Sequence, residues 1–129
     1  MSSKRVGRWT LPNDSTSPGR ARDVVRLALV LASNDIRDVA ELLTSEVVTN
    51  AVTFSHGDVL VRIEVEARAI RVSIYDGGPG LPVLSEPDPL GEHGRGLHIV
   101  QALADDWGVV TNVDAEEAGK TVWFTLHDF

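Results

Sequence analysis

The chain has 129 residues, of which 43% are apolar and 24% are charged, and it contains no cysteine. This length fits one domain, and the apolar fraction is sufficient for one packed core. The absence of cysteine excludes disulfides, thiolate zinc sites and a cysteine nucleophile. No stretch approaches the roughly 18 consecutive apolar residues of a membrane-spanning helix, and no apolar signal segment is visible, so we expect a cytoplasmic protein without a membrane anchor.

Charge is distributed unevenly along the chain. Residues 1–26 hold six basic and two acidic side chains, whereas the remaining residues hold six basic and seventeen acidic ones. The acidic body would repel a phosphate backbone, which argues against direct DNA binding. The basic start is either a patch for a partner or a solvated tail, and the tail is the preferred interpretation.

The first part of the chain divides into a short leading segment and the beginning of the main domain. Residues 1–17 contain a possible edge strand at 6–11, followed by turn-forming residues. The main domain, 18–129, is expected to begin with a helix, because apolar residues recur there at steps of three and four. These apolar residues are Ala21, Val24, Val25, Ala28 and Leu31.

A second helix is expected from about Asp35 to Phe54, because one apolar arc continues through this segment. The arc comprises Val39, Leu42, Leu43, Val47, Ala51 and Phe54. Glu46 and Asn50, at positions i and i+4, are predicted to fall in the middle of this arc. A carboxylate and an amide are costly to bury unless they are paired or bound to a ligand. A structural pair and a binding site both remain open as explanations.

Two alternating runs follow, at 59–66 and 70–75, and a short turn separates them. Each run places its valines and isoleucines on one side, which is typical of strands with one buried face. The second run ends at Asp76, after which glycines and prolines open a loop that cannot be regular structure. A loop of this length in a small domain is usually functional or disordered.

The glycine pair Gly94 and Gly96 opens a third predicted helix, and strands at about 107–111 and 121–127 close the domain. This order predicts an α+β two-layer sandwich, in which a mixed, largely antiparallel sheet is covered on one face by helices. A glycine-rich turn at a helix start is also a place where phosphates bind. Neither the dinucleotide-binding pattern nor a P-loop fits, because Ile99 and Asp114 occupy positions where those motifs require glycine.

The glycines and carboxylates, taken in order, resemble the nucleotide-binding domain of the GHKL superfamily (the Bergerat ATP-binding fold), which includes gyrase-type ATPases, Hsp90, sensor histidine kinases and MutL. Four boxes carry the resemblance: Glu46 to Asn50, Asp76 to Gly80, Gly94 to Gly96, and Gly119 to Thr121. Within this superfamily, the segments ELLTSEVVTNAV and GRGLHIVQALADDWGV most resemble stand-alone bacterial anti-sigma-factor serine/threonine kinases of the actinobacterial type.

The resemblance implies ATP and Mg²⁺ as cofactors and a role for each box. Glu46 would be the catalytic general base, Asn50 would ligate Mg²⁺, and Asp76 would accept a hydrogen bond from the adenine amino group. Residues 81–93 would form a lid over ATP. The other cofactor-binding residues would be Gly78 and Gly80 beside the base, Gly94, Arg95, Gly96 and Leu97 at the phosphates, and Thr121 at the adenine end.

The resemblance also implies an activity and partners. The chain would be a homodimeric Mg-ATP-dependent kinase that binds a sigma factor, phosphorylates a STAS-type anti-anti-sigma protein and regulates transcription by partner switching. Family members often carry a basic residue and a histidine where this chain has Thr53 and Phe54. This departure supports an alternative, an ATP-binding module that sequesters a sigma factor or another regulator without phosphotransfer. Two simpler interpretations also remain, with Asp76 as a turn residue and Arg95 as a solvent-facing side chain.

Overall fold

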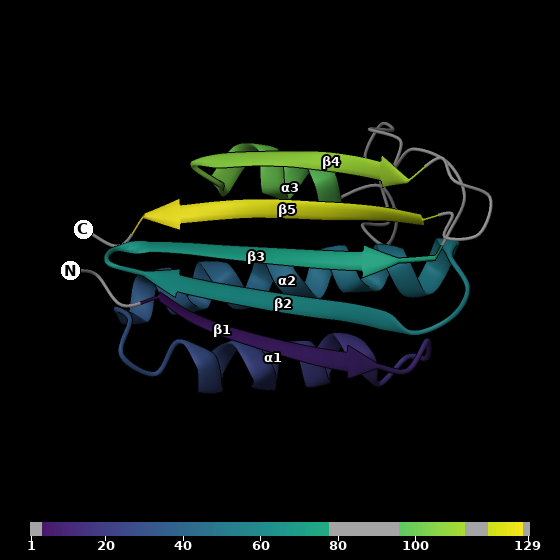
Figure 1. Ribbon diagram of the computed structural model, residues 1–129, viewed down its shortest axis with the longest axis horizontal. Coiled ribbons are helices and arrows are strands. Elements are labelled where there is room, and N and C mark those ends of the chain that lie inside the picture. Colours follow the sequence, from purple (N-terminus) through teal and green to yellow (C-terminus); the bar gives the residue numbers. More distant parts are fainter. Residues whose placement is uncertain (1–3, 78–95, 113–118, 128–129) are drawn as a thin grey trace.

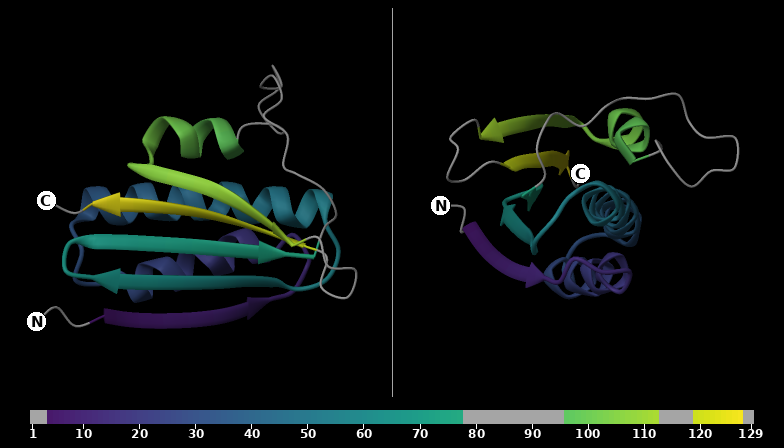
Figure 2. Two further views of the ribbon diagram at one scale, coloured as in Figure 1. Left: turned by 45° about the horizontal axis from the view of Figure 1, so that its top comes forward. Right: turned by 90° about the vertical axis from the view of Figure 1, so that its right-hand side faces the viewer.

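The structure is a computed structural model that describes residues 4–77, 96–112 and 119–127. In chain order its elements are β1 (Lys4–Leu11), α1 (Ser17–Ala28), α2 (Asn34–Phe54), β2 (Val59–Glu66), β3 (Ala69–Asp76), α3 (Gly96–Leu103), β4 (Asp106–Asn112) and β5 (Gly119–His127). The strands form one sheet, and the helices all lie on the same face of it (Figure 1; Figure 2). The predicted α+β two-layer sandwich is confirmed.

The strand order in the sheet is β1-β2-β3-β5-β4. All four pairings within the described ranges are antiparallel, so no parallel pair of a mixed sheet occurs there. β5 follows β4 in sequence, but it lies between β3 and β4 in the sheet. The possible edge strand is confirmed, since β1 occupies one edge. The basic start of the chain therefore belongs to the sheet from Lys4 onward rather than to a solvated tail.

Alternation of apolar and polar residues explains why β2, β3 and β5 have one covered face. Val61, Val72 and Phe124 are at most 1% exposed, whereas Arg62 on the opposite face of β2 is exposed. The buried faces of these strands pack against the helices to form the core. The core residues are Leu11, Ala21, Val25, Leu29, Ala40, Leu43, Val47, Val48, Ala51, Val59, Val61, Ile63, Ile70, Val72, Ile74, Val100, Val122, Phe124 and Leu126.

The first helix ends earlier than its apolar pattern predicts. Leu29 is the C-cap of α1, and its backbone N–H donates to the carbonyl of Val25. Leu29 is 2% exposed, whereas Leu31, which was predicted to face inward, is 80% exposed. The reason is that Leu31 lies past the end of the helix and no longer follows its spacing.

The second helix begins directly after Ser33, whose hydroxyl caps it by accepting a hydrogen bond from the backbone N–H of Ile36. Its buried face is rotated from the predicted arc. Leu42 is 41% exposed and Phe54 63% exposed, while Ser45 is buried and donates its hydroxyl proton to the Leu42 carbonyl. A hydroxyl satisfied within its own helix can be buried at little cost. None of the described helices is long and apolar enough to cross a membrane.

Candidate active site

The elements that contain the described parts of the predicted boxes meet at one end of the sheet. Figure 1 shows the end of β3, the start of β5, the start of α3 and the C-terminal half of α2 at the same end of the molecule. Antiparallel pairing of β3 with β5 explains part of this arrangement, because it places the last residue of one strand beside the first residues of the other. Part of the predicted site falls outside the described residues, namely Gly78, Gly80, Gly94, Arg95 and the lid at 81–93.

A buried ion pair marks this end of the sheet. Asp76, the last residue of β3, is 2% exposed, and its register partner Lys120 on β5 is 9% exposed. The Lys120 Nζ donates to the Asp76 Oδ1 over 2.9 Å. Asp76 is therefore a buried acceptor held by a cation at the end of β3.

Strand alternation places both members of the pair on the covered face of the sheet. Asp76 follows Ile74 at the inward positions of β3, and Lys120 precedes Val122 at the inward positions of β5. The backbones also approach closely at this point. A Cβ at Gly119 would lie 2.6 Å from the backbone oxygen of Asp76, closer than real atoms come. Only glycine at position 119 lets β5 start in this place.

Lys120 was not among the predicted site residues, although the sequence contains a signal for it. It is a charged residue at an inward position of an alternating strand, where charge is costly unless paired. The sequence interpretation assigned the adenine end to Thr121 instead. Thr121 lines a hollow of about 330 Å³ on the open face of the sheet, together with Leu60 and Tyr75. The structure thus brings Lys120, and not Thr121, beside Asp76.

Glu46 and Asn50 lie at the margin of the buried face of α2. Both side chains are partly buried, while Val47 and Ala51, the residues that follow them, are 3% and 2% exposed. Their predicted position in the middle of the buried arc is wrong, because the arc is rotated toward Thr44 and Val48. The two side chains still share one side of the helix, at i and i+4. They can therefore present a carboxylate and an amide oxygen to the same ligand.

The third helix begins at Gly96, as the glycine turn predicts. Gly96 and Leu97 therefore belong to its first turn, where backbone N–H groups have no acceptor within the helix. Val100 is fully buried and anchors this turn against the core. N–H groups at such a position suit a phosphate.

The described donor set fits a magnesium ion that arrives with a nucleotide. No cluster of three or more histidine, cysteine, aspartate or glutamate residues that could hold a metal is found in the described part of the chain. Asn50 offers one amide oxygen, and Mg²⁺ is commonly held by one or two protein oxygens together with water and substrate phosphates. The residues present therefore fit nucleotide-carried Mg²⁺ better than a metal centre built by the protein alone.

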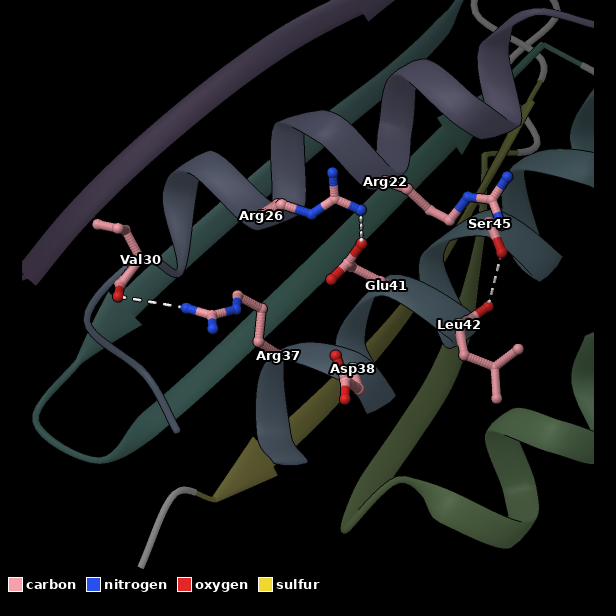
Figure 3. Close-up of a pocket in the computed structure, with 8 residues that line it drawn as sticks. All are labelled: Arg22, Arg26, Val30, Arg37, Asp38, Glu41, Leu42 and Ser45. Atoms are coloured by element: carbon pink, nitrogen blue, oxygen red, sulfur yellow. Dashed lines mark hydrogen bonds and ion pairs between the residues drawn. The ribbon is translucent and has the colours of Figure 1, made fainter. Parts of the chain in front are cut away.

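A hollow of about 630 Å³ lies away from this site, between α1 and α2, and Figure 3 shows the residues that line it. The Arg26 guanidinium donates to Glu41 over 2.7 Å, and the Arg37 guanidinium donates to the Val30 carbonyl over 3.3 Å. These contacts tie the two helices together. We interpret the hollow as a charged seam between helices and not as a catalytic site.

Comparison with known families agrees with this geometry. The chain matches the family of histidine kinase-like ATPase domains over residues 11–126. It therefore belongs to this family, which confirms the GHKL-type ATPase assignment made from the four boxes. A comparison with curated proteins found no match.

Solved structures share the fold. Sixteen chains match, and one of them comes from the crystal structure of the RsbU and RsbW domains of Rv1364c from Mycobacterium tuberculosis. The TM-score with that chain is 0.71 at 18% sequence identity, and the match covers 96% of this chain. This chain spans only 32% of that longer chain. At this identity the likeness shows the fold alone.

Proposed function

We propose that this chain is a Mg²⁺-ATP-dependent serine/threonine kinase of the anti-sigma-factor type. In this proposal it acts in the cytoplasm, phosphorylates a STAS-type anti-anti-sigma protein and binds a sigma factor in the alternative state of a partner switch. Membership of the ATPase family supports the nucleotide, and the name of the RsbW domain in the solved neighbour is consistent with the partners. The observation that carries the proposal is the arrangement of two elements: the C-terminal half of α2, which contains Glu46 and Asn50, lies at the same end of the molecule as the end of β3, which contains buried Asp76 (Figure 1).

Each of these residues has a distinct task in the proposal. The Glu46 carboxylate takes the proton from the attacking serine or threonine hydroxyl, and its side chain is only partly buried, so a substrate can reach it. Asn50, one turn further along α2, holds Mg²⁺ through its amide oxygen. Asp76 accepts a hydrogen bond from the base. Mg²⁺, when bound with ATP, neutralises charge on the phosphates.

The Glu46→Gln variant tests this assignment. We expect phosphotransfer to a purified STAS-type acceptor to fall by about 10²–10⁴-fold, the usual contribution of a general base. Binding of ATP should stay nearly unchanged, because the amide keeps the size of the side chain. Asp38→Asn, which alters an exposed carboxylate on the same helix, is the matched control. A fully active Glu46→Gln protein would contradict the role given to Glu46.

The end of α2 favours a second candidate function, a module that binds a regulator without phosphotransfer. Phe54 is 63% exposed, and the Thr53 hydroxyl donates to the Thr49 carbonyl within the helix. Neither side chain supplies the cation that relatives often carry there. Mixing the protein with labelled ATP and purified partners distinguishes the two functions. A stable complex without label on the partner supports the module, and label on the partner supports the kinase.

The surface of α1 supports the proposed homodimer. Leu27 near the end of α1 is 73% exposed, and Val30 and Leu31, in the segment that follows the helix, are 61% and 80% exposed. Exposed large apolar side chains in one stretch of the chain mark a candidate contact surface. Light scattering at micromolar concentration tests this proposal, and a single species of 14.0 kDa would contradict it.

A further inference from the structure

We propose that Lys120 is a positioning residue for the nucleobase. Its ammonium group holds the Asp76 carboxylate in the orientation that accepts a hydrogen bond from the 6-amino group of a purine nucleotide. This inference rests on the proposed function, because it assumes that ATP binds at this end of the sheet. It adds a determinant of base selectivity that lies outside the four predicted roles of the boxes.

The first argument is the electrostatic state of Asp76. Its side chain is 4% exposed, and an ionised carboxylate at such a depth is stable only when it is paired or hydrogen-bonded. The Lys120 ammonium, 2.9 Å from Oδ1, supplies that pairing. The cation thus offsets the cost of burying the carboxylate that is to accept the hydrogen bond from the base.

The second argument is the capacity that remains on the carboxylate. An ionised carboxylate offers about four acceptor sites on its two oxygens. The bond from Lys120 uses one of them, on Oδ1. It restrains rotation of the side chain. The lysine therefore orients the acceptor without occupying all of it.

The third argument is the rigidity of the support. Lys120 and Asp76 are direct register partners in the centre of the sheet, where β3 pairs with β5. The Lys120 side chain is 11% exposed, which restricts the conformations open to its long stem. The close approach at Gly119 fixes the neighbouring backbone. The ammonium position is thus set by the fold, which a positioning role demands.

The experiment compares two ligands that differ by one amino group. The affinities of Mg-ATP and of purine riboside triphosphate, which lacks the 6-amino group, are measured by calorimetry. Proteins compared are the wild type, Asp76→Asn, Lys120→Met and Lys120→Arg. Lys4→Met is the matched control, because Lys4 pairs with Glu64 on β2 in a more exposed setting. Circular dichroism checks that each variant is folded, and Lys120→Gln replaces Lys120→Met if the latter does not fold.

We expect the wild type to prefer ATP over the analogue by about tenfold or more, the selectivity of a hydrogen bond to a charged group. This preference should nearly disappear in Asp76→Asn and in Lys120→Met, and return in part in Lys120→Arg. Lys4→Met should keep the wild-type ratio. The ratio is informative because a general disturbance of the pocket weakens both ligands equally.

Three results would overturn the inference. Equal losses for both ligands in Lys120→Met, with the ratio unchanged, would show that the lysine has a structural role alone. Tighter ATP binding by Lys120→Met would show that the lysine competes with the base. No binding of either ligand by the wild type would overturn the proposed function as well, and this pattern differs from the other two.

Discussion

Two ion pairs in this domain use the same chemistry in different surroundings. Lys120 and Asp76 join β5 to β3 over 2.9 Å, with side chains 11% and 4% exposed. Arg26 and Glu41 join α1 to α2 over 2.7 Å, with side chains 61% and 13% exposed. The shorter distance suggests that the helix pair is the stronger of the two. Because the sheet pair is more deeply buried, however, we expect removal of one partner to lower the free energy of unfolding more in the sheet pair.

The reversal follows from what each remaining charge meets after its partner is removed. Water solvates a charge at the surface, so an exposed pair contributes roughly 0–1 kcal/mol to stability. A buried charge left alone cannot be solvated, and removing its partner costs about 3–5 kcal/mol. The helix pair therefore acts as a replaceable contact, whereas the sheet pair cannot lose one member without penalty.

The largest expected effect tests this difference directly. Lys120→Met should lower the free energy of unfolding by about 3–5 kcal/mol, because Asp76 is left buried without its cation. Arg26→Met, which removes the more exposed cation and leaves Glu41 at 13% exposure, should lower it by less than Lys120→Met does, because Glu41 keeps more contact with water than Asp76. Urea denaturation of the two variants measures both values. Equal losses would show that burial does not separate the pairs.

A smaller effect is expected at the backbone that supports the buried pair. Gly119→Ala should destabilise the protein by about 1–3 kcal/mol, because the added Cβ would overlap the Asp76 backbone oxygen and the Tyr75 hydroxyl. Gly19→Ala in α1 is the control, since nothing lies within 4 Å of a Cβ there. That change should stabilise the helix by about 0.5–1 kcal/mol. Thermal unfolding decides the sign of each change, and a neutral Gly119→Ala would refute the close approach.

The smallest effect concerns Glu64, which pairs with Lys4 at side-chain exposures of 15% and 46%. The hydrogen bond from Lys4, 2.7 Å away, lowers the pKa of Glu64 below its ordinary 4.5; burial opposes this, and Arg62 adds to it. A lowered pKa gives stability that is present above the ordinary value and is lost as the pH falls through the folded-state value.

Replacing Glu64 with glutamine removes this titration. The free energy of unfolding of wild type should therefore fall more steeply below pH 4.5 than that of Glu64→Gln. The difference should be about 1 kcal/mol or less, because the pair is partly open to water. Urea denaturation at a series of acidic pH values measures it. Parallel curves for the two proteins would argue against the Lys4 contact.

Local patterns predicted most of the fold, because strands and helices have fixed periods. Alternation around Val61 and Val72 identified two strands and their buried sides, and the glycine turn located the start of α3. The rotation of α2 was not predictable in the same way. Leu42 and Phe54 have the right spacing for an inward face, but whether they are covered depends on neighbours that sequence spacing does not specify.

The candidate site likewise contains residues that local sequence patterns predict and a residue that only the fold reveals. Glu46, Asn50 and Asp76 were predicted as site residues because their residue types and spacing resemble family boxes. Lys120 needed the strand register, because its partner Asp76 lies 44 positions away in the sequence. The alternation of inward and outward residues along β5 indicates that Lys120 faces inward. Only the pairing of β3 with β5 shows which carboxylate it contacts.

The place of β5 inside the sheet has a consequence for how the protein is made. During synthesis β1, β2 and β3 can pair with one another as they emerge, but β4 has no strand partner in the described sheet until β5 is available. Lys120 lies on the same strand, β5. Asp76 therefore meets Lys120 only after β5 has been made, and a ribosome that stops before β5 releases a product without this ion pair.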